Sequence, residues 1–299
     1  MPLAVLAFLL EPFRYDFFVR GLVAATVVGA LCGLVGGFVV LRRMSYIGHG
    51  LSHSVFGGAV VSYVMGWNFY LGAGLWGFLS AALINWTARR RQIGADAAIG
   101  IVTTASFAVG VAIISKARRF TRNFDAALFG NVLGVQPEDV LVVLGVTALI
   151  AITIFFAYRQ LLFMTFDPDV APLYGVPSEW ADALLSLVLA ATVITSMQIL
   201  GVTMIAAILV VPAVTARLLT DSFSRLLLLA TVLGTVCGLV GLLLSYYLDV
   251  ASGATVVLTA AAIFLVTFAT TSVRRHLRTS EARRSAARLN PAQISDLYE

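Results

Sequence analysis

Charged residues are scarce in this sequence. They make up 12% of its 299 residues, and hydrophobic residues make up 60%, whereas soluble proteins usually contain about 25% charged residues. The mean hydropathy of +0.96 therefore excludes a water-soluble fold for most of the chain. Because a membrane-spanning helix needs about 20 apolar residues, the length leaves room for roughly eight to ten spans and for no large soluble domain.

Lysine and cysteine are nearly absent, and each scarcity excludes a class of site. The single lysine, Lys116, lies in SKARR, so the chain has no phosphate-binding loop of the G-x-x-x-x-G-K-[ST] type. If ATP drives this protein, another chain binds the nucleotide. Cys32 and Cys237 lie in apolar stretches, which excludes a disulfide framework and a C-x-x-C motif. Arginine between apolar stretches indicates membrane topology rather than nucleic-acid binding.

Nine low-charge runs predict an all-α fold, a polytopic transmembrane helical bundle of about eight or nine spans. Residues 1–16 are predicted to be an interfacial lead-in that is retained, since a basic signal-peptide n-region is lacking. Residues 17–273 form the transmembrane domain, and 274–299 a basic tail on the cytoplasmic side that is partly helical or disordered. The runs are approximately Phe17–Leu41, Tyr46–Met65, Phe69–Ala88, Ala97–Ser115, Val140–Ala157, Ala181–Met197, Val202–Leu219, Leu226–Tyr247 and Gly253–Ser272.

Arginine placement orients the predicted spans. Most arginine clusters fall on one side if nine spans alternate, and the positive-inside rule makes that side the cytoplasm. The N-terminus is then outside and the C-terminus inside. One segment disagrees, because Lys116, Arg118, Arg119 and Arg122 fall outside. The agreeing clusters are Arg42 and Arg43, Arg89 to Arg91, Arg159, Arg217 and Arg225, and Arg274, Arg275 and Arg278.

Small residues recur at four-residue spacing in two of the spans. Gly29, Gly33 and Gly37 share one face of the first span, and Gly234 and Gly238 share one face of the eighth. Glycines at this spacing let helix backbones approach closely within a membrane. We expect these faces to pack in the bundle rather than to gate a pathway.

Two histidines lie four residues apart just inside the second span. On a helix, His49 and His53 project from one face and can share one ion, and imidazole suits zinc, copper, iron and nickel better than manganese. The alternative is that they hydrogen-bond across helices. Ionisable groups at membrane depth usually mark a pathway, and we therefore predict metal contact.

The histidine spacing also resembles that of an intramembrane metalloprotease, but the sequence excludes that chemistry. The H-E-x-x-H motif needs a glutamate beside its first histidine as general base, and here Gly50 stands in that place. Further candidate pathway contacts are weaker, since flexible packing explains methionine and a small-hydrophobe role explains cysteine. These candidates are Asn131, Asp249, Met65, Met197 and Met204.

A polar connection rich in proline and glycine joins the fifth and sixth spans. Pro168 and Pro172 favour helix starts and Gly175 a helix stop, which predicts a short helix along the membrane surface with Asp167 and Asp169 at its positive end. The alternative is an ordinary solvated loop.

Six segments in a fixed order, across Phe13 to Phe268, give the chain a family resemblance. It resembles the permease family of ATP-binding-cassette importers that take up zinc, manganese or iron with a separate binding protein and ATPase. The segments are YIGHGLSHSVFGGA, IGADAAIGIVTTASFAVGVAI, LFGNVLGV, TFDPDVAPLYGVP, ILGVTMIAAILVVPAVTARLLT and LLLSYYLDVASGATVVL.

The resemblance implies a permease homodimer that encloses the pathway, a cytoplasmic ATPase and an external metal-binding protein, in a bacterial-type plasma membrane. No cofactor is implied beyond the transported zinc, manganese or iron ion. It also implies that one cytoplasmic segment couples the permease to the ATPase. That segment comprises Asp167, Pro168, Asp169, Val170, Ala171, Pro172, Leu173, Tyr174 and Gly175.

His53 matches the family's intramembrane histidine, whereas His49 stands where the family often has aspartate in G-D-x-L-S-H. An imidazole in place of a carboxylate makes the site softer and favours zinc over manganese. Protonation of the imidazoles is then expected to oppose metal entry at acidic pH.

The sequence thus predicts a permease of an ATP-driven importer, with alternating access, and no enzyme. One alternative is an ATP-independent secondary transporter, which predicts ionisable residues in several spans, and these are scarce. Another is the permease of a siderophore or vitamin importer with structural histidines. A membrane enzyme lacks a base or nucleophile cluster.

Overall fold

The computed structural model describes residues 10–88, 95–117, 130–167, 170–175 and 178–286. In these ranges the chain is helical and contains no β-strand, which confirms the predicted all-α class. Three short 3-10 helices accompany nine α-helices within the described residues. In chain order the elements are η1 (Glu11–Arg14), α2 (Asp16–Leu41), α3 (Ser45–Met65), α4 (Phe69–Ala88), α5 (Ala95–Ala117), η2 (Val132–Gly134), α7 (Pro137–Phe166), η3 (Ala171–Tyr174), α8 (Ser178–Leu200), α9 (Val202–Leu219), α10 (Phe223–Leu248) and α11 (Ser252–Ala286).

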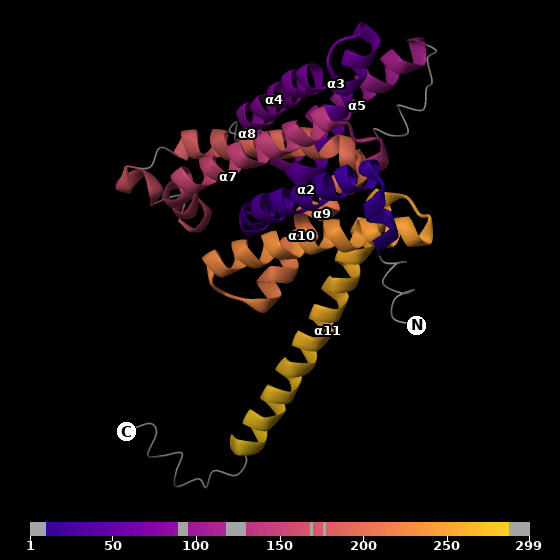
Figure 1. Cartoon of the computed structure of the whole chain (residues 1–299). Coiled ribbons are helices and arrows are strands. Elements are labelled where there is room, and N and C mark those ends of the chain that lie inside the picture. The colour runs from indigo at the N-terminus through magenta and orange to yellow at the C-terminus, as the bar shows by residue number, and fades with distance from the viewer. Residues whose placement is uncertain (1–9, 89–94, 118–129, 168–169, 176–177, 287–299) are drawn as a thin grey trace.

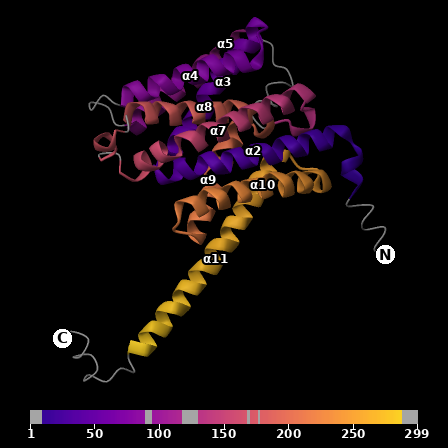
Figure 2. The ribbon, with the colours of Figure 1, turned by 60° about the vertical axis from the view of Figure 1, so that its left-hand side comes forward.

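The α-helices form an elongated bundle with two groups and a middle layer (Figure 1). Helix α3 packs mainly against α5 and α4, while α2 packs mainly against α10 and α9. Helix α8 contacts members of both groups, whereas α7 packs against α2 and α8, and both helices lie between the two groups (Figure 2). Helix α11 packs against α10 and α9 and then leaves the bundle at an angle.

Helices α2 and α10 contact each other through the glycines that the sequence singled out. A Cβ on Gly29 would collide with the carbonyl oxygen of Gly234, and one on Gly33 would collide with that of Ala230. In the same contact, Gly238 of α10 lies against the backbone of Ala25 in α2. The predicted packing role of both glycine faces is therefore confirmed, because any side chain there would force the two helices apart.

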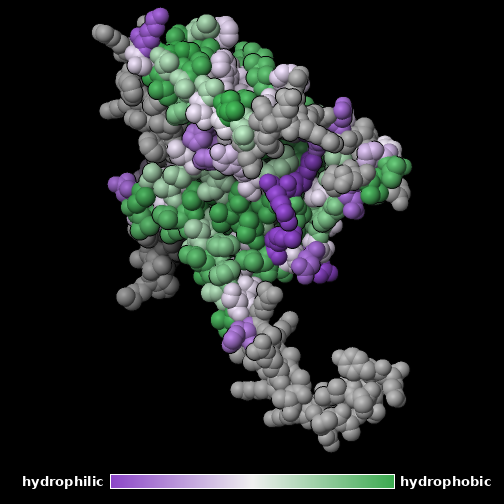
Figure 3. Space-filling view, turned by 180° about the vertical axis from the view of Figure 1, so that it is seen from behind, coloured by the Kyte–Doolittle hydropathy of each residue, from purple (hydrophilic) through white to green (hydrophobic). Residues whose placement is uncertain are grey.

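Eight of the helices in the described ranges are long and apolar enough to cross a membrane. Helix α3 is not among them, since its serines, histidines and glycines make it less apolar. Large hydrophobic side chains remain exposed on the outside, such as Phe155 and Phe156 on α7. Hydrophobic residues cover much of the face seen in Figure 3, and such a surface requires lipid rather than water.

Tight turns join successive helices at the two ends of the bundle. Gly66, with φ of 69°, ends α3, and Gly201, with φ of 77°, separates α8 from α9. The interruptions predicted near Gly66 and Gly201 are therefore turns. We call the end where α2 meets α3 the arginine end, after Arg42 and Arg43, and the opposite end the tyrosine end, after Tyr70.

Two helices are longer than their apolar runs predicted. Helix α7 begins at Pro137 rather than Val140 and reaches Phe166, and α11 continues to Ala286, well into the predicted tail. Lys116 is exposed near the end of α5, whereas Arg118, Arg119 and Arg122 lie outside the described residues. The orientation conflict in that segment therefore stays open.

Candidate functional site

His49 and His53 lie side by side on one face of α3, as their spacing predicted. Their ring centroids are 4.8 Å apart and the rings meet edge to face at 81°. The His49 side chain is exposed on the surface of the single chain, and His53 is partly buried. The His53 ring also contacts the edge of Phe107 on α5, at 5.3 Å between centroids.

Small residues hold α3 close to its neighbours and fix the histidine face. A Cβ on Gly50 would meet the side chains of Ile99 and Thr103 on α5 at 2.7 and 2.8 Å. Four residues further along α3, the Ser54 hydroxyl donates to Ser80 Oγ of α4 at 2.6 Å. The histidine face is therefore carried by a helix whose adjoining face packs tightly against α5 and α4.

The pair offers two imidazoles and no third protein ligand within the described residues. Those residues hold no cluster of three or more His, Cys, Asp or Glu side chains that could bind a metal. Two ligands, with the rest of the shell open to water or to a second chain, hold an ion weakly enough to release it, unlike a closed four-ligand site.

The weaker candidates do not gather around the histidines. Met197 is fully buried in the core. Asn131 uses its side-chain oxygen to accept from the Gly134 backbone at 3.0 Å, and Asp249 is the exposed cap of α10. Met65 is exposed at the far end of α3. Met204 is partly buried in the first turn of α9.

The predicted coupling segment contains a short 3-10 helix at the arginine end. Ala171 is fully buried and packs with Met164 and Ala181, whereas Leu173 is 83% exposed. Gly175, with φ of 75°, ends the helix, as predicted. Asp167 caps α7 and is exposed, Val170 and Pro172 are exposed, and Pro168 and Asp169 lie outside the described residues.

The sequence did not predict two sets of polar contacts between helices, one at each end of the bundle. At the tyrosine end, the Tyr70 hydroxyl of α4 contacts Asp139 Oδ1 of α7 at 2.9 Å and Gln198 Oε1 of α8 at 2.5 Å. At the arginine end, Arg42 pairs with Asp182 of α8. The partners are far apart in sequence, so only the fold reveals them.

Comparison with known proteins finds similarity over most of the chain. The family model described as "ABC 3 transport family" matches residues 14–271. The "Manganese transport system membrane protein MntC" of Halalkalibacterium halodurans is 37% identical over 254 residues, covering 85% of this chain and 87% of that protein. A "Probable iron transport system membrane protein" of Haemophilus influenzae is 34% identical over 264 residues, covering 88% and 93%.

A solved structure agrees with the sequence comparisons. The structure titled "PsaBC from Streptococcus pneumoniae in complex with Fab" superposes with a TM-score of 0.81 at 35% identity, covering 88% of this chain and 95% of that chain. The resemblance read from the six sequence segments is therefore confirmed. The chain belongs to the ABC 3 transport family.

Proposed function

We propose that this chain is the membrane permease of an ATP-driven importer for a divalent transition-metal ion, and that His49 and His53 contact the ion as it passes. The observation that carries the proposal is the pair of adjacent imidazoles, 4.8 Å apart, on helix α3 of an ABC 3 chain. Imidazoles at membrane depth are costly to keep unless they serve a pathway.

Two kinds of support bear on the identity of the metal. The relatives' printed names include manganese and iron, whereas a pair of imidazoles is a softer donor set that favours zinc. We infer that the cargo is one of these first-row divalent ions. A direct competition experiment decides among them.

The exposed position of His49 supports a homodimer. A single chain leaves this imidazole on its surface, where it would face lipid or an aqueous path. A second copy across the pathway would shield the two histidines from lipid and enclose the route. Two histidines from each chain would then face the same pathway.

The 3-10 helix at the arginine end supports attachment of a separate ATPase. Val170, Pro172 and Leu173 expose apolar surface there while Ala171 anchors the helix to α7 and α8. ATP-driven closure of the partner would move this anchored helix and rock the bundle between outward and inward access. The positive-inside rule places the arginine end, and with it the C-terminus, in the cytoplasm.

The test is metal uptake into vesicles that contain the permease together with its ATPase. Radioactive manganese and zinc are supplied with the external binding protein, with and without ATP, and unlabelled manganese, zinc or iron competes. ATP-dependent uptake that one metal inhibits at the lowest concentration supports the proposal and names the cargo. ATP-independent uptake would favour a secondary transporter, and uptake of a siderophore or vitamin alone would favour another importer class.

A further inference from the structure

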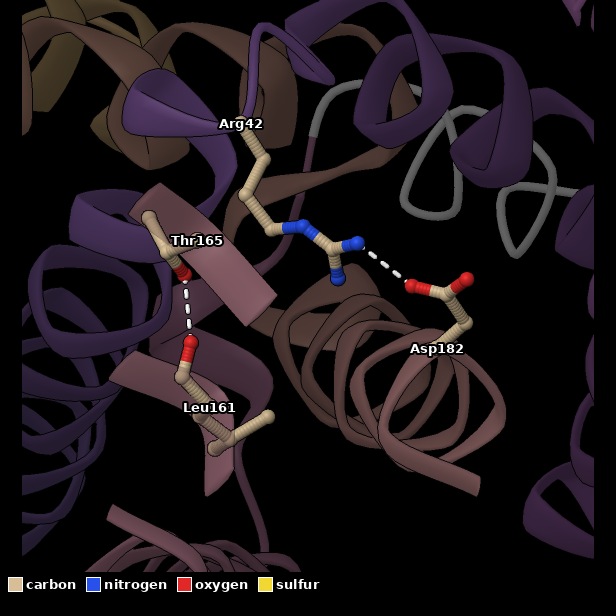
Figure 4. A network of polar contacts seen from close by, with 4 residues as sticks. All are labelled: Arg42, Leu161, Thr165 and Asp182. Atoms are coloured by element: carbon tan, nitrogen blue, oxygen red, sulfur yellow. Dashed lines mark hydrogen bonds and ion pairs between the residues drawn. The ribbon is translucent and has the colours of Figure 1, made fainter. Parts of the chain in front are cut away.

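An ion pair joins two helices at the arginine end of the bundle. The guanidinium of Arg42, the residue that caps α2, contacts the Asp182 carboxylate in the second turn of α8 (Figure 4). The Arg42 side chain is only 12% exposed and that of Asp182 is 34% exposed. The end of α7 lies beside the pair, where the Thr165 hydroxyl donates to the Leu161 carbonyl at 2.6 Å.

The position of Arg42 ties it to the helix that carries the histidines. Helix α3 begins at Ser45, and a tight turn precedes it in which Arg43 adopts φ of 56° and the Met44 N–H donates to the Val39 carbonyl at 2.8 Å. Few rotatable residues therefore separate Arg42 from α3. A displacement of Arg42 is passed to the start of α3 and towards His49.

The position of Asp182 ties it to the segment that we assign to the ATPase. Helix α8 follows that segment almost at once, beginning at Ser178. Ala181, the neighbour of Asp182, belongs to one buried cluster with Ala171 of η3 and Met164 of α7. A displacement of η3 can therefore reach Asp182 through this buried cluster and the adjacent residue Ala181.

Stability alone gives little reason for an ion pair at this place. Removing two charges from water costs about as much as their attraction returns, and apolar replacements are often neutral or better. The Nη1 atom of Arg42 is buried and makes no hydrogen bond within the described residues, so the guanidinium is not held by a full set of acceptors. The Arg42–Asp182 pair is therefore better described as a contact that can shift than as a fixed one.

We infer that the Arg42–Asp182 pair transmits movement of the ATPase-coupling segment to α3 and thereby positions the histidine face. This inference rests on the proposed function. Arg42 and Asp182 act through α3 and do not touch the metal, so they are positioning residues.

The test compares two variants that break the pair with two controls in the permease–ATPase complex. Asp182→Asn removes one charge of the pair with little change in size, and Arg42→Gln removes the other and leaves a shorter polar side chain. Thr165→Val removes a neighbouring hydroxyl that bonds within its own helix. Arg225→Gln removes an exposed charge in the first turn of α10.

Two readouts are taken in the same vesicles, ATP hydrolysis and ATP-dependent metal uptake. Asp182→Asn and Arg42→Gln are expected to lower uptake by about tenfold or more, within the usual range of coupling between sites, while ATP hydrolysis changes little. The ratio of metal moved to ATP hydrolysed then falls. Both controls are expected to keep that ratio.

A third readout does not depend on the cargo. Spin labels on exposed Met65, at the end of α3, and exposed Leu248, at the end of α10, report movement between the two helix groups when ATP is added. The wild type is expected to show an ATP-dependent distance change that Asp182→Asn loses. This readout remains valid even if the wild type transports no metal, a result that would contradict the proposed function alone.

Two outcomes would overturn the inference. If the pair variants lose uptake and hydrolysis together and also fail to assemble, the pair only stabilises the fold. If they keep both the transport ratio and the distance change, movement reaches α3 by another route. Arg42→Lys, which keeps the charge, is expected to restore most of the ratio lost in Arg42→Gln.

Discussion

Helices α2 and α3 are neighbours in the chain, yet they differ in polarity and in what their surfaces expose. Helix α2 is strongly apolar and mostly buried, and its glycines lie against the backbone of α10. Helix α3 is too polar to count among the candidate spans, and it leaves His49 exposed. The difference suggests that α2 is the fixed spine of the bundle, while α3 combines one packed face with one face open to the pathway.

The largest expected effect comes from disrupting the contact between α2 and α10. Gly33→Val in α2 would drive a side chain into the Ala230 carbonyl, and overpacking costs about 1–3 kcal/mol or more. We expect little correctly assembled protein, measured as monodisperse yield in detergent. Gly145→Val in α7 is the matched control, because a Cβ there meets nothing within 4 Å. Equal yields of the two variants would contradict the spine role of α2.

A smaller effect on uptake is expected from acid, through the two histidines of α3. Protons compete with metal for imidazole nitrogens, so wild-type uptake should fall as pH decreases from about 7.5 to 5.5. His49→Asp replaces one imidazole with a carboxylate that stays ionised at these pH values. Its uptake should therefore fall less steeply with acid. Parallel pH profiles for the two proteins would show that His49 does not contact the metal.

The tyrosine-end cluster should contribute a moderate amount to stability. Tyr70→Phe removes the hydroxyl that Asp139 and Gln198 each contact; both acceptors are partly buried, and one hydrogen bond contributes a net of about 0.5–1.5 kcal/mol. A thermal unfolding experiment on the purified chain measures the loss. Tyr158→Phe is the comparison, since its partner Ser224 is exposed. If Tyr158→Phe lowers the unfolding temperature as much as Tyr70→Phe, the tyrosine-end cluster does not join α4, α7 and α8 more strongly than an ordinary exposed hydrogen bond.

The smallest effect is expected on the packed face of α3. Ser54→Ala removes its hydrogen bond to Ser80, and such bonds between membrane helices average about 0.6 kcal/mol. Only a slight drop in unfolding temperature should follow, with uptake unchanged. A large loss of uptake would place the pathway on the α4 side of α3 instead of the histidine side.

Much of the helical core could be predicted from the sequence, since the lipid requirement fixes where apolar runs occur. Helix α9 has the predicted bounds, Val202–Leu219. The extension of α11 was left open between helix and disorder because charge ended the apolar run, although Arg, Glu and Ala in that stretch are good helix formers. The longer α7 has start signals in Pro137 and the capping box of Gln136 with Asp139, which hydropathy does not detect.

In the candidate site, too, the sequence predicts local features but not contacts between distant segments. Four-residue spacing predicts that His49 and His53 share a helix face, because that is a local property of α3. Local sequence does not predict that Asp182 returns beside Arg42, which lies 140 residues away. Arg42 was therefore interpreted only as a marker of topology, and its partner became visible when α2 and α8 were placed together.

The most direct test of the account is ATP-dependent metal uptake by His49→Ala and His53→Ala, measured beside Ser54→Ala as a control on the same helix. Each variant is first checked for assembly with the ATPase and for wild-type unfolding temperature. The account predicts that both histidine variants assemble normally and lose uptake, while Ser54→Ala transports. Normal uptake by correctly assembled histidine variants would show that the imidazoles only pack the bundle, and it would contradict the proposed path along α3.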